Sequence, residues 1–155
     1  MFDVAFSLLM CCSLVCKAIL KALLPWLSLD TPIIAAPMDT ICETEMAIAL
    51  HKQGAMGILH RYNDPEEQLK MYLEVQKAGA QCAAAIGTGE DSLERAIALA
   101  GAGCEVICID VAHGHHVNVK KTLESLRGAL KDNIHIMTGN VATPQAFVDL
   151  SEWGA

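Results

Sequence analysis

Residues 105–116 read EVICIDVAHGHH, and they contain the clearest predicted β-strand of the chain, at 105–111. Positions 106–109 are all apolar, which is typical of a strand in a parallel sheet that is covered on both faces. A polar loop with one glycine and three histidines follows, and 117–130 has a helical pattern. The order of strand, polar loop and helix predicts one βα unit.

The same order of elements recurs on both sides of this unit. Before it, the sequence predicts strands at 32–36, 58–59 and 82–86 and helices at 43–53, 64–78 and 90–100. After it, a strand is predicted at 134–137, and a last helix begins with Pro144. Five such units predict an α/β fold whose parallel strands are joined by right-handed crossovers.

Two α/β folds have this order of elements, an open doubly wound sheet and a (β/α)8 barrel. No Gly-x-Gly-x-x-Gly motif follows the first strand, which disfavours the dinucleotide-binding open sheet. The polar, glycine-containing clusters follow the strands, and barrel enzymes have their active sites on that C-terminal face. A complete barrel takes about 250 residues. The favoured interpretation is therefore a partial TIM barrel of about five βα units.

Residues with capping roles predict where several helices begin and end. Gly79 is expected to end the second helix. Thr88 and Asp91 have the spacing of a capping box for the third helix. Thr143-Pro144 predicts the start of the last helix, with threonine as the cap and proline in the first turn.

The composition fits one domain with a substantial core, because 53% of the 155 residues are hydrophobic and 19% are charged. Eleven Lys and Arg residues stand against 18 Asp and Glu residues, which gives a formal net charge of −7. An acidic chain without a basic cluster does not have the surface of a nucleic-acid-binding protein.

The chain has seven cysteines, and none of them forms a Cys-x-x-Cys pair. An odd number, partly within apolar runs, indicates buried free thiols rather than a disulfide framework or a zinc site. Free thiols predict a reducing, cytoplasmic location. The seven are Cys11, Cys12, Cys16, Cys42, Cys82, Cys104 and Cys108.

Residues 1–29 form an apolar segment that differs from the rest of the chain. The apolar run 4–16 is shorter than the roughly 18 residues of a membrane-spanning helix. Asp3 is the only charge before this run, whereas a secretory signal has a basic start. We expect a helix that is not a targeting signal. A buried or partner-covered helix, a weak membrane anchor and sequence foreign to the rest are the alternatives.

The loops of residues 30–155 resemble the IMP dehydrogenase/GMP reductase family. Five motifs occur in register, each at the end of a predicted strand, whereas residues 1–29 do not resemble the family's usual start. The motifs are AAPMDT at 35–40, GILHR at 57–61, AAIGT at 84–88, DVAHGH at 110–115 and GNVAT at 139–143.

The resemblance implies a (β/α)8 barrel that binds a purine nucleotide and a nicotinamide cofactor on its C-terminal face. The dehydrogenase converts IMP to XMP with NAD, and the reductase converts GMP to IMP with NADPH, both within purine nucleotide metabolism. Both use a cysteine nucleophile at C2 of the purine, since a thiolate attacks well and can leave again. The loop at 110–115 resembles that of many dehydrogenases, so a dehydrogenase is favoured and a reductase is the alternative.

The resemblance assigns three residues to the purine nucleotide. Met38 would contact the base or the ribose, and its thioether suits a flat ring. Gly139 and Asn140 would form the turn beneath the reacting ring, with the Asn140 amide available for a hydrogen bond. The alternative for Met38 is a side chain that fills the top of the barrel.

Four further residues are assigned to the cofactor. Asp110 would accept the hydroxyls of the nicotinamide ribose, and His113 and Gly114 belong to the same loop. His60 would line the same pocket, although a structural role is equally compatible with a single histidine. The three histidines at 113, 115 and 116 are not predicted to bind a metal.

The family's catalytic loop, Gly-x-Gly-Ser-x-Cys-x-Thr, does not occur in the 155 residues. No catalytic residue is therefore assigned, and the monovalent cation site expected with that loop is not assigned either. The sequence predicts a fragment that is inactive and marginally stable alone. A non-catalytic product that binds nucleotide or associates with full-length subunits is a further alternative. Family members are commonly homotetramers.

Overall fold

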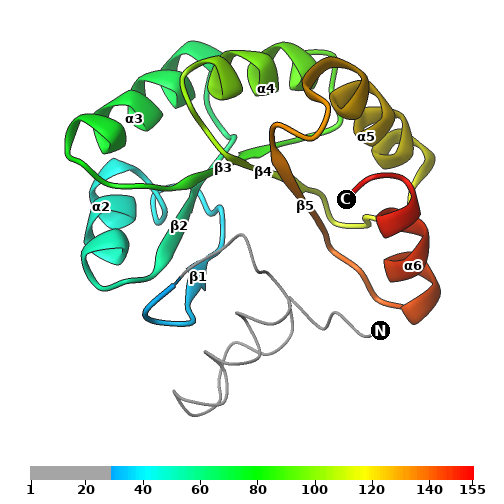
Figure 1. The fold of residues 1–155 in the computed structure, drawn as a ribbon, viewed down its shortest axis with the longest axis horizontal. Coiled ribbons are helices and arrows are strands. Elements are labelled where there is room, and N and C mark those ends of the chain that lie inside the picture. Colours follow the sequence, from blue (N-terminus) through cyan, green and yellow to red (C-terminus); the bar gives the residue numbers. More distant parts are fainter. Residues whose placement is uncertain (1–28) are drawn as a thin grey trace.

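The computed structural model describes residues 29–155, and the expectations for the preceding apolar segment lie outside the described residues. Five parallel strands form one sheet in the order of the sequence (Figure 1). The strands are β1 (Ile34–Ala35), β2 (Met56–Leu59), β3 (Ala83–Ile86), β4 (Val106–Asp110) and β5 (His135–Gly139).

A helix follows each strand and lies on the outer side of the curved sheet (Figure 1). The helices are α2 (Thr44–Lys52), α3 (Pro65–Lys77), α4 (Ser92–Gly101), α5 (Val117–Leu130) and α6 (Pro144–Glu152). Strands that curl around an axis inside a layer of helices form a partial TIM barrel, which confirms the predicted fold.

The central strands are apolar on both faces because each face packs into a separate cluster. Leu59, Ile107 and Ile109 face the helices and join the larger cluster, which includes Leu123 and Leu126 of α5. Alternate strand residues belong to a smaller cluster on the other face of the sheet. Its buried members are Met56, Ile58, Ala83, Ala85, Val106 and Cys108.

Most predicted helix ends are confirmed, and one cap differs. Gly79, which follows the C-cap residue Ala78 of α3, has a positive φ of 71°, a conformation that favours glycine. The Thr143 hydroxyl accepts a hydrogen bond from the amide of Ala146 at 3.2 Å. The capping box at 88–91 does not form: α4 begins at Ser92, and the Asp91 carboxylate pairs with the Arg95 guanidinium at 3.0 Å instead of capping the helix.

Among residues 29–155, the two outermost strands each pair with one neighbouring strand. β1 pairs with β2 through two residues, and β5 pairs with β4 through five.

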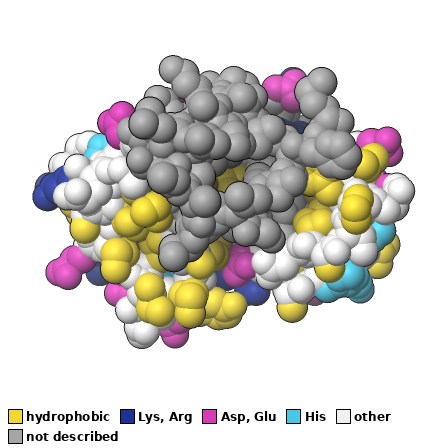
Figure 2. Space-filling view, turned by 90° about the horizontal axis from the view of Figure 1, so that it is seen from below, with side chains coloured by type: hydrophobic (Ala, Val, Ile, Leu, Met, Phe, Trp, Pro, Cys, Tyr) yellow, Lys and Arg dark blue, Asp and Glu magenta, His cyan; other side chains and the backbone are white. Residues whose placement is uncertain are grey.

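Figure 2 views the molecule from below relative to Figure 1, and hydrophobic side chains lie on the surface there. Within residues 29–155, no helix is long and apolar enough to cross a membrane.

The four described cysteines are free and buried, as the sequence predicts. Burial raises the pKa of the Cys104 thiol to about 11 and that of Cys108 to about 12. The thiols are therefore protonated at neutral pH, which makes them inert core residues rather than nucleophiles. Cys11, Cys12 and Cys16 lie outside the described residues.

Candidate functional site

The loops that follow the parallel strands meet at the carboxyl edge of the sheet. The loop after β4 and the loop after β5 are joined by main-chain hydrogen bonds. The amide of Gly114 donates to the Asn140 carbonyl at 2.8 Å, and the amide of Asn140 donates to the Val111 carbonyl at 2.8 Å. The Asn140 side-chain amide also donates to the Val111 carbonyl at 3.2 Å. Gly114 and Asn140, one predicted residue from each loop, are therefore held together.

Gly114 allows this close approach. A Cβ atom at Gly114 would lie 2.9 Å from the Asn140 carbonyl oxygen, closer than real Cβ atoms come. Gly114 therefore has a structural role, because it leaves room for the Asn140 carbonyl of the neighbouring loop. Close approach of a cofactor to Gly114 stays a prediction.

Asp110 ends β4 and is partly exposed. Its main-chain carbonyl accepts a hydrogen bond from Nε of Arg61 at 3.2 Å. No described residue forms a hydrogen bond or an ion pair with its carboxylate. The carboxylate is thus available to accept two hydroxyl groups, which fits the predicted contact with a ribose.

Arg61 links the loops after β2, β3 and β4. Besides its bond to Asp110, its guanidinium lies 5.0 Å from the centre of the Tyr62 ring. A Cβ atom added at Gly87 would meet the guanidinium at 3.2 Å. Arg61 belongs to the GILHR motif, but its sequence position alone did not predict this role. It places a positive charge between three loops, where an anionic ligand would gain from it.

His60 lies on the other side of the site, between β2 and the loop after β1. The residue is 3% exposed, and its Nδ1 accepts a hydrogen bond from the Tyr62 amide at 3.2 Å. Its Nε2 lies 3.5 Å from a Glu43 carboxylate oxygen and 3.8 Å from one of Asp39. The structure therefore places His60 beside two carboxylates that sequence reasoning had not connected with it.

Met38 and His113 are both exposed and make no described contact with the other predicted residues. The Met38 side chain is 52% exposed, whereas its carbonyl accepts the amides of Ile41 and Cys42 in a tight turn. The exposure leaves the Met38 side chain accessible to a ligand and disfavours the alternative that it only fills the barrel. The convergence of Met38 with Asp110 and Asn140 on one ligand stays a prediction.

The other two histidines of the loop after β4 have structural partners. His115 Nε2 lies 2.8 Å from the Asp149 carboxylate, and the ring stacks on Trp153 of the final turn. His116 Nδ1 accepts a hydrogen bond from the Asn118 amide at the start of α5. These contacts dock α6 against the loop and cap α5.

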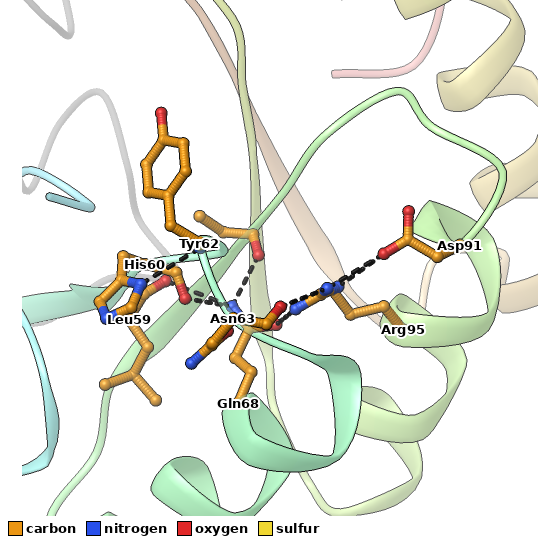
Figure 3. A network of polar contacts seen from close by, with 8 residues as sticks. Leu59, His60, Tyr62, Asn63, Gln68, Asp91 and Arg95 are labelled. Atoms are coloured by element: carbon orange, nitrogen blue, oxygen red, sulfur yellow. Dashed lines mark hydrogen bonds and ion pairs between the residues drawn. The ribbon is translucent and has the colours of Figure 1, made fainter. Parts of the chain in front are cut away.

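Sequence reasoning missed a polar network beneath the loops (Figure 3). Gln68 of α3 is fully buried, and its Nε2 donates to the carbonyls of His60 at 2.9 Å and Ala85 at 2.8 Å. Arg95 of α4 donates to Gln68 Oε1 at 3.1 Å and to the Asn63 carbonyl at 2.9 Å. The network fixes the ends of β2 and β3, from which the candidate site projects.

Comparison with known proteins supports the family resemblance that the loop motifs indicate. The family model "IMP dehydrogenase / GMP reductase domain" matches residues 15–155, so its match begins within the apolar N-terminal segment. The chain is 31% identical to the inosine-5'-monophosphate dehydrogenase of Cryptosporidium parvum, over 83% of this chain and 42% of that protein. It is 32% identical to the GMP reductase of Mycoplasma mycoides subsp. mycoides SC, over 80% of this chain and 39% of that protein.

A solved structure extends the likeness to the fold. The crystal structure of inosine 5' monophosphate dehydrogenase from Legionella pneumophila superimposes with a TM-score of 0.77 and 43% sequence identity. The match covers 83% of this chain and 39% of the solved chain, so this chain spans about two fifths of the length of its relatives. Strand order, loop motifs and sequence similarity agree, and the chain belongs to the IMP dehydrogenase/GMP reductase family.

Proposed function

We propose that residues 30–155 form the nucleotide-binding part of a purine nucleotide oxidoreductase that converts IMP to XMP with NAD. The observation that carries this proposal is the joined loop unit of Asp110, Gly114 and Gly139–Asn140 at the carboxyl edge of the sheet. The loop sequence 110–115 and the 43% identical dehydrogenase structure support the dehydrogenase.

In this proposal, Asp110 orients the cofactor. The unpaired carboxylate accepts the two hydroxyls of the nicotinamide ribose, and the Arg61–Asp110 hydrogen bond holds the end of β4 in place. His113 and His60 line the cofactor pocket. NAD supplies hydride acceptance at its nicotinamide ring, and the residues of this chain contribute binding and orientation.

In the same proposal, the purine nucleotide lies over the loops after β1 and β5. The exposed Met38 thioether contacts the base or ribose, and Gly139 and Asn140 lie beneath the ring. The family's cysteine loop is not among the 155 residues. We therefore expect this chain to bind nucleotide without turnover when it is alone. Homotetramer formation and a cytoplasmic location also belong to the proposal.

A GMP reductase is the second candidate, with GMP as substrate and NADPH as reductant. The 32% identical reductase of Mycoplasma mycoides, close to the 31% of the Cryptosporidium dehydrogenase, favours it as the alternative. The two candidates differ in which nucleotide and which cofactor bind more tightly.

Calorimetric titration of the whole chain with IMP, GMP, NAD and NADPH tests the proposal. We expect IMP and NAD to bind more tightly than GMP and NADPH, and the reverse order would support the reductase. Asp110→Asn is expected to weaken cofactor binding by about tenfold or more, because hydrogen bonds to a charged group are lost. Asp132→Asn, an equal charge change before β5, serves as the control. Equal affinities of the two variants would contradict the assigned site.

A further inference from the structure

Three potential metal ligands converge between α2 and the end of β2. One oxygen each from Asp39 and Glu43 and a ring nitrogen of His60 all lie within 4.8 Å of one another. Metal–ligand distances of about 2.0–2.2 Å place neighbouring ligand atoms about 3.0–3.5 Å apart. The separation of His60 Nε2 from the Glu43 oxygen, 3.5 Å, lies at the upper end of this range, and its separation from the Asp39 oxygen, 3.8 Å, exceeds the range by a few tenths of an ångström.

His60 supplies an observation that is independent of the carboxylates. Its Nε2 is buried and has no hydrogen-bond partner among the described residues, although it faces both acidic side chains. A buried polar atom without a partner is rare in proteins and often marks a missing ion or water. The carboxylates are 61% and 51% exposed, so they can close the remaining distance without repacking the core.

Local backbone structure holds the ligands in place. Glu43 occupies the N-cap position of α2, yet its side chain makes no capping hydrogen bond. The His60 amide donates to the Cys42 carbonyl, which ties the end of β2 to the loop that carries Asp39 and Glu43. The ligand atoms thus come from two segments that are already joined.

The surrounding groove is acidic. Its volume is about 860 Å³, and besides Asp39 and Glu43 it is lined by Glu45, Glu67 and Glu74. Neither Lys nor Arg is among its described lining residues. A groove of this charge attracts cations.

We propose that Asp39, Glu43 and His60 form a binding site for a first-row divalent metal ion of the zinc type. An imidazole with two carboxylates suits such an ion better than calcium or magnesium, which prefer oxygen ligands alone. Three protein ligands leave further coordination positions for water. The bound ion would fix the turn after β1, which also carries Met38.

Binding requires one change at the imidazole. Because Nδ1 accepts the Tyr62 amide, the neutral ring carries its proton on Nε2. Metal coordination at Nε2 moves that proton to Nδ1 and opens the Tyr62 hydrogen bond. The Tyr62 amide then has to turn away from Nδ1, and no net proton is released.

Titration of the tag-free whole chain with Zn²⁺, followed by calorimetry, tests the site, and Co²⁺ provides a visible absorption readout. We expect one metal equivalent whose affinity falls by at least about tenfold in Glu43→Gln and in Asp39→Asn. Both residues are exposed, so folding is preserved, and circular dichroism would verify this. Glu45→Gln removes the same charge from the same groove and is expected to retain the affinity.

The histidines at 113, 115 and 116 could also bind zinc, and the paired variants distinguish them. Equal zinc affinity in Glu43→Gln and Glu45→Gln would overturn the proposal, as would a chain that binds no zinc. Loss of the tetrahedral Co²⁺ absorption in His60→Asn, with the spectrum kept in Glu45→Gln, would support it.

Discussion

Because Gly114 has no side chain, two loops of the candidate site can approach each other closely. Gly114→Ala would bring a Cβ atom within 2.9 Å of the Asn140 carbonyl oxygen, and the loops would have to separate. We expect a loss of about 1–3 kcal/mol in the free energy of unfolding, as is typical of overpacking. Urea unfolding followed by circular dichroism measures it.

Gly128 is the matched control for this substitution. It lies in α5, and apart from the backbone of its own helix and its chain neighbours no atom comes within 4 Å of a Cβ added there. Gly128→Ala should stabilise the protein by about 0.5–1 kcal/mol, because alanine favours the helix. Destabilisation of similar size in both variants would contradict the close approach of the loops.

The buried thiols predict how stability depends on alkaline pH. Burial, followed by the nearby Asp110 charge, raises the pKa of Cys108 from 9.0 to about 12. The folded protein holds this proton more tightly than the unfolded chain. The protonated Cys108 thiol therefore makes its full contribution to the free energy of unfolding below about pH 9. This contribution is lost as the pH rises toward about 12, by up to about 1.4 kcal/mol per pH unit.

Urea unfolding of wild type and Cys108→Ala between about pH 8 and about pH 10.5 measures this loss. The variant should lose less stability per pH unit above about pH 9 than the wild type, whatever its stability at neutral pH. Parallel pH dependences in the two proteins would show that Cys108 does not titrate in the folded core.

Among the elements, α3 and α4 hold the strand ends in place through one buried glutamine. Gln68→Met keeps the approximate volume but removes the donor to the His60 and Ala85 carbonyls and the acceptor for Arg95. We expect a loss of about 2–4 kcal/mol in the free energy of unfolding, since buried polar groups lose their partners. Urea unfolding measures the change.

Gln53→Met provides the comparison at an exposed residue after α2. Its side chain makes no described hydrogen bond, so the substitution should change stability by no more than about 0.5 kcal/mol. If the two variants were equally stable, the network in Figure 3 would not hold the elements together.

The sequence predicted these elements where local signals were strong. The bounds of α5 agree with the pattern at 117–130, and the Thr143 cap starts α6 as expected. β1 has two residues and is shorter than the apolar run at 32–36 from which it was predicted. The start of α4 differs because Arg95 binds the Asp91 carboxylate, a contact that depends on the buried position of Arg95.

For the whole molecule, parallel topology made part of the site predictable. Loops after adjacent parallel strands meet at one edge, so Asp110, Gly114 and Asn140 could be placed together from their motifs. The surroundings of His60 could not be predicted from the sequence, because they depend on the turn at residues 38–42. In this turn Thr40 has a positive φ of 57°. The Gln68–Arg95 contact depends on how α3 and α4 pack and has no local sequence signal.

The central claim is that the loops after β1, β4 and β5 form a shared nucleotide-binding surface. Amide chemical shifts of the ¹⁵N-labelled chain, recorded during titration with IMP and with NAD, test it most directly. We predict that the shifts concentrate at residues 38–39, 110–114 and 139–141. Saturable binding whose shifts fall on the opposite, amino-terminal edge of the sheet, or no shifts at all, would contradict it.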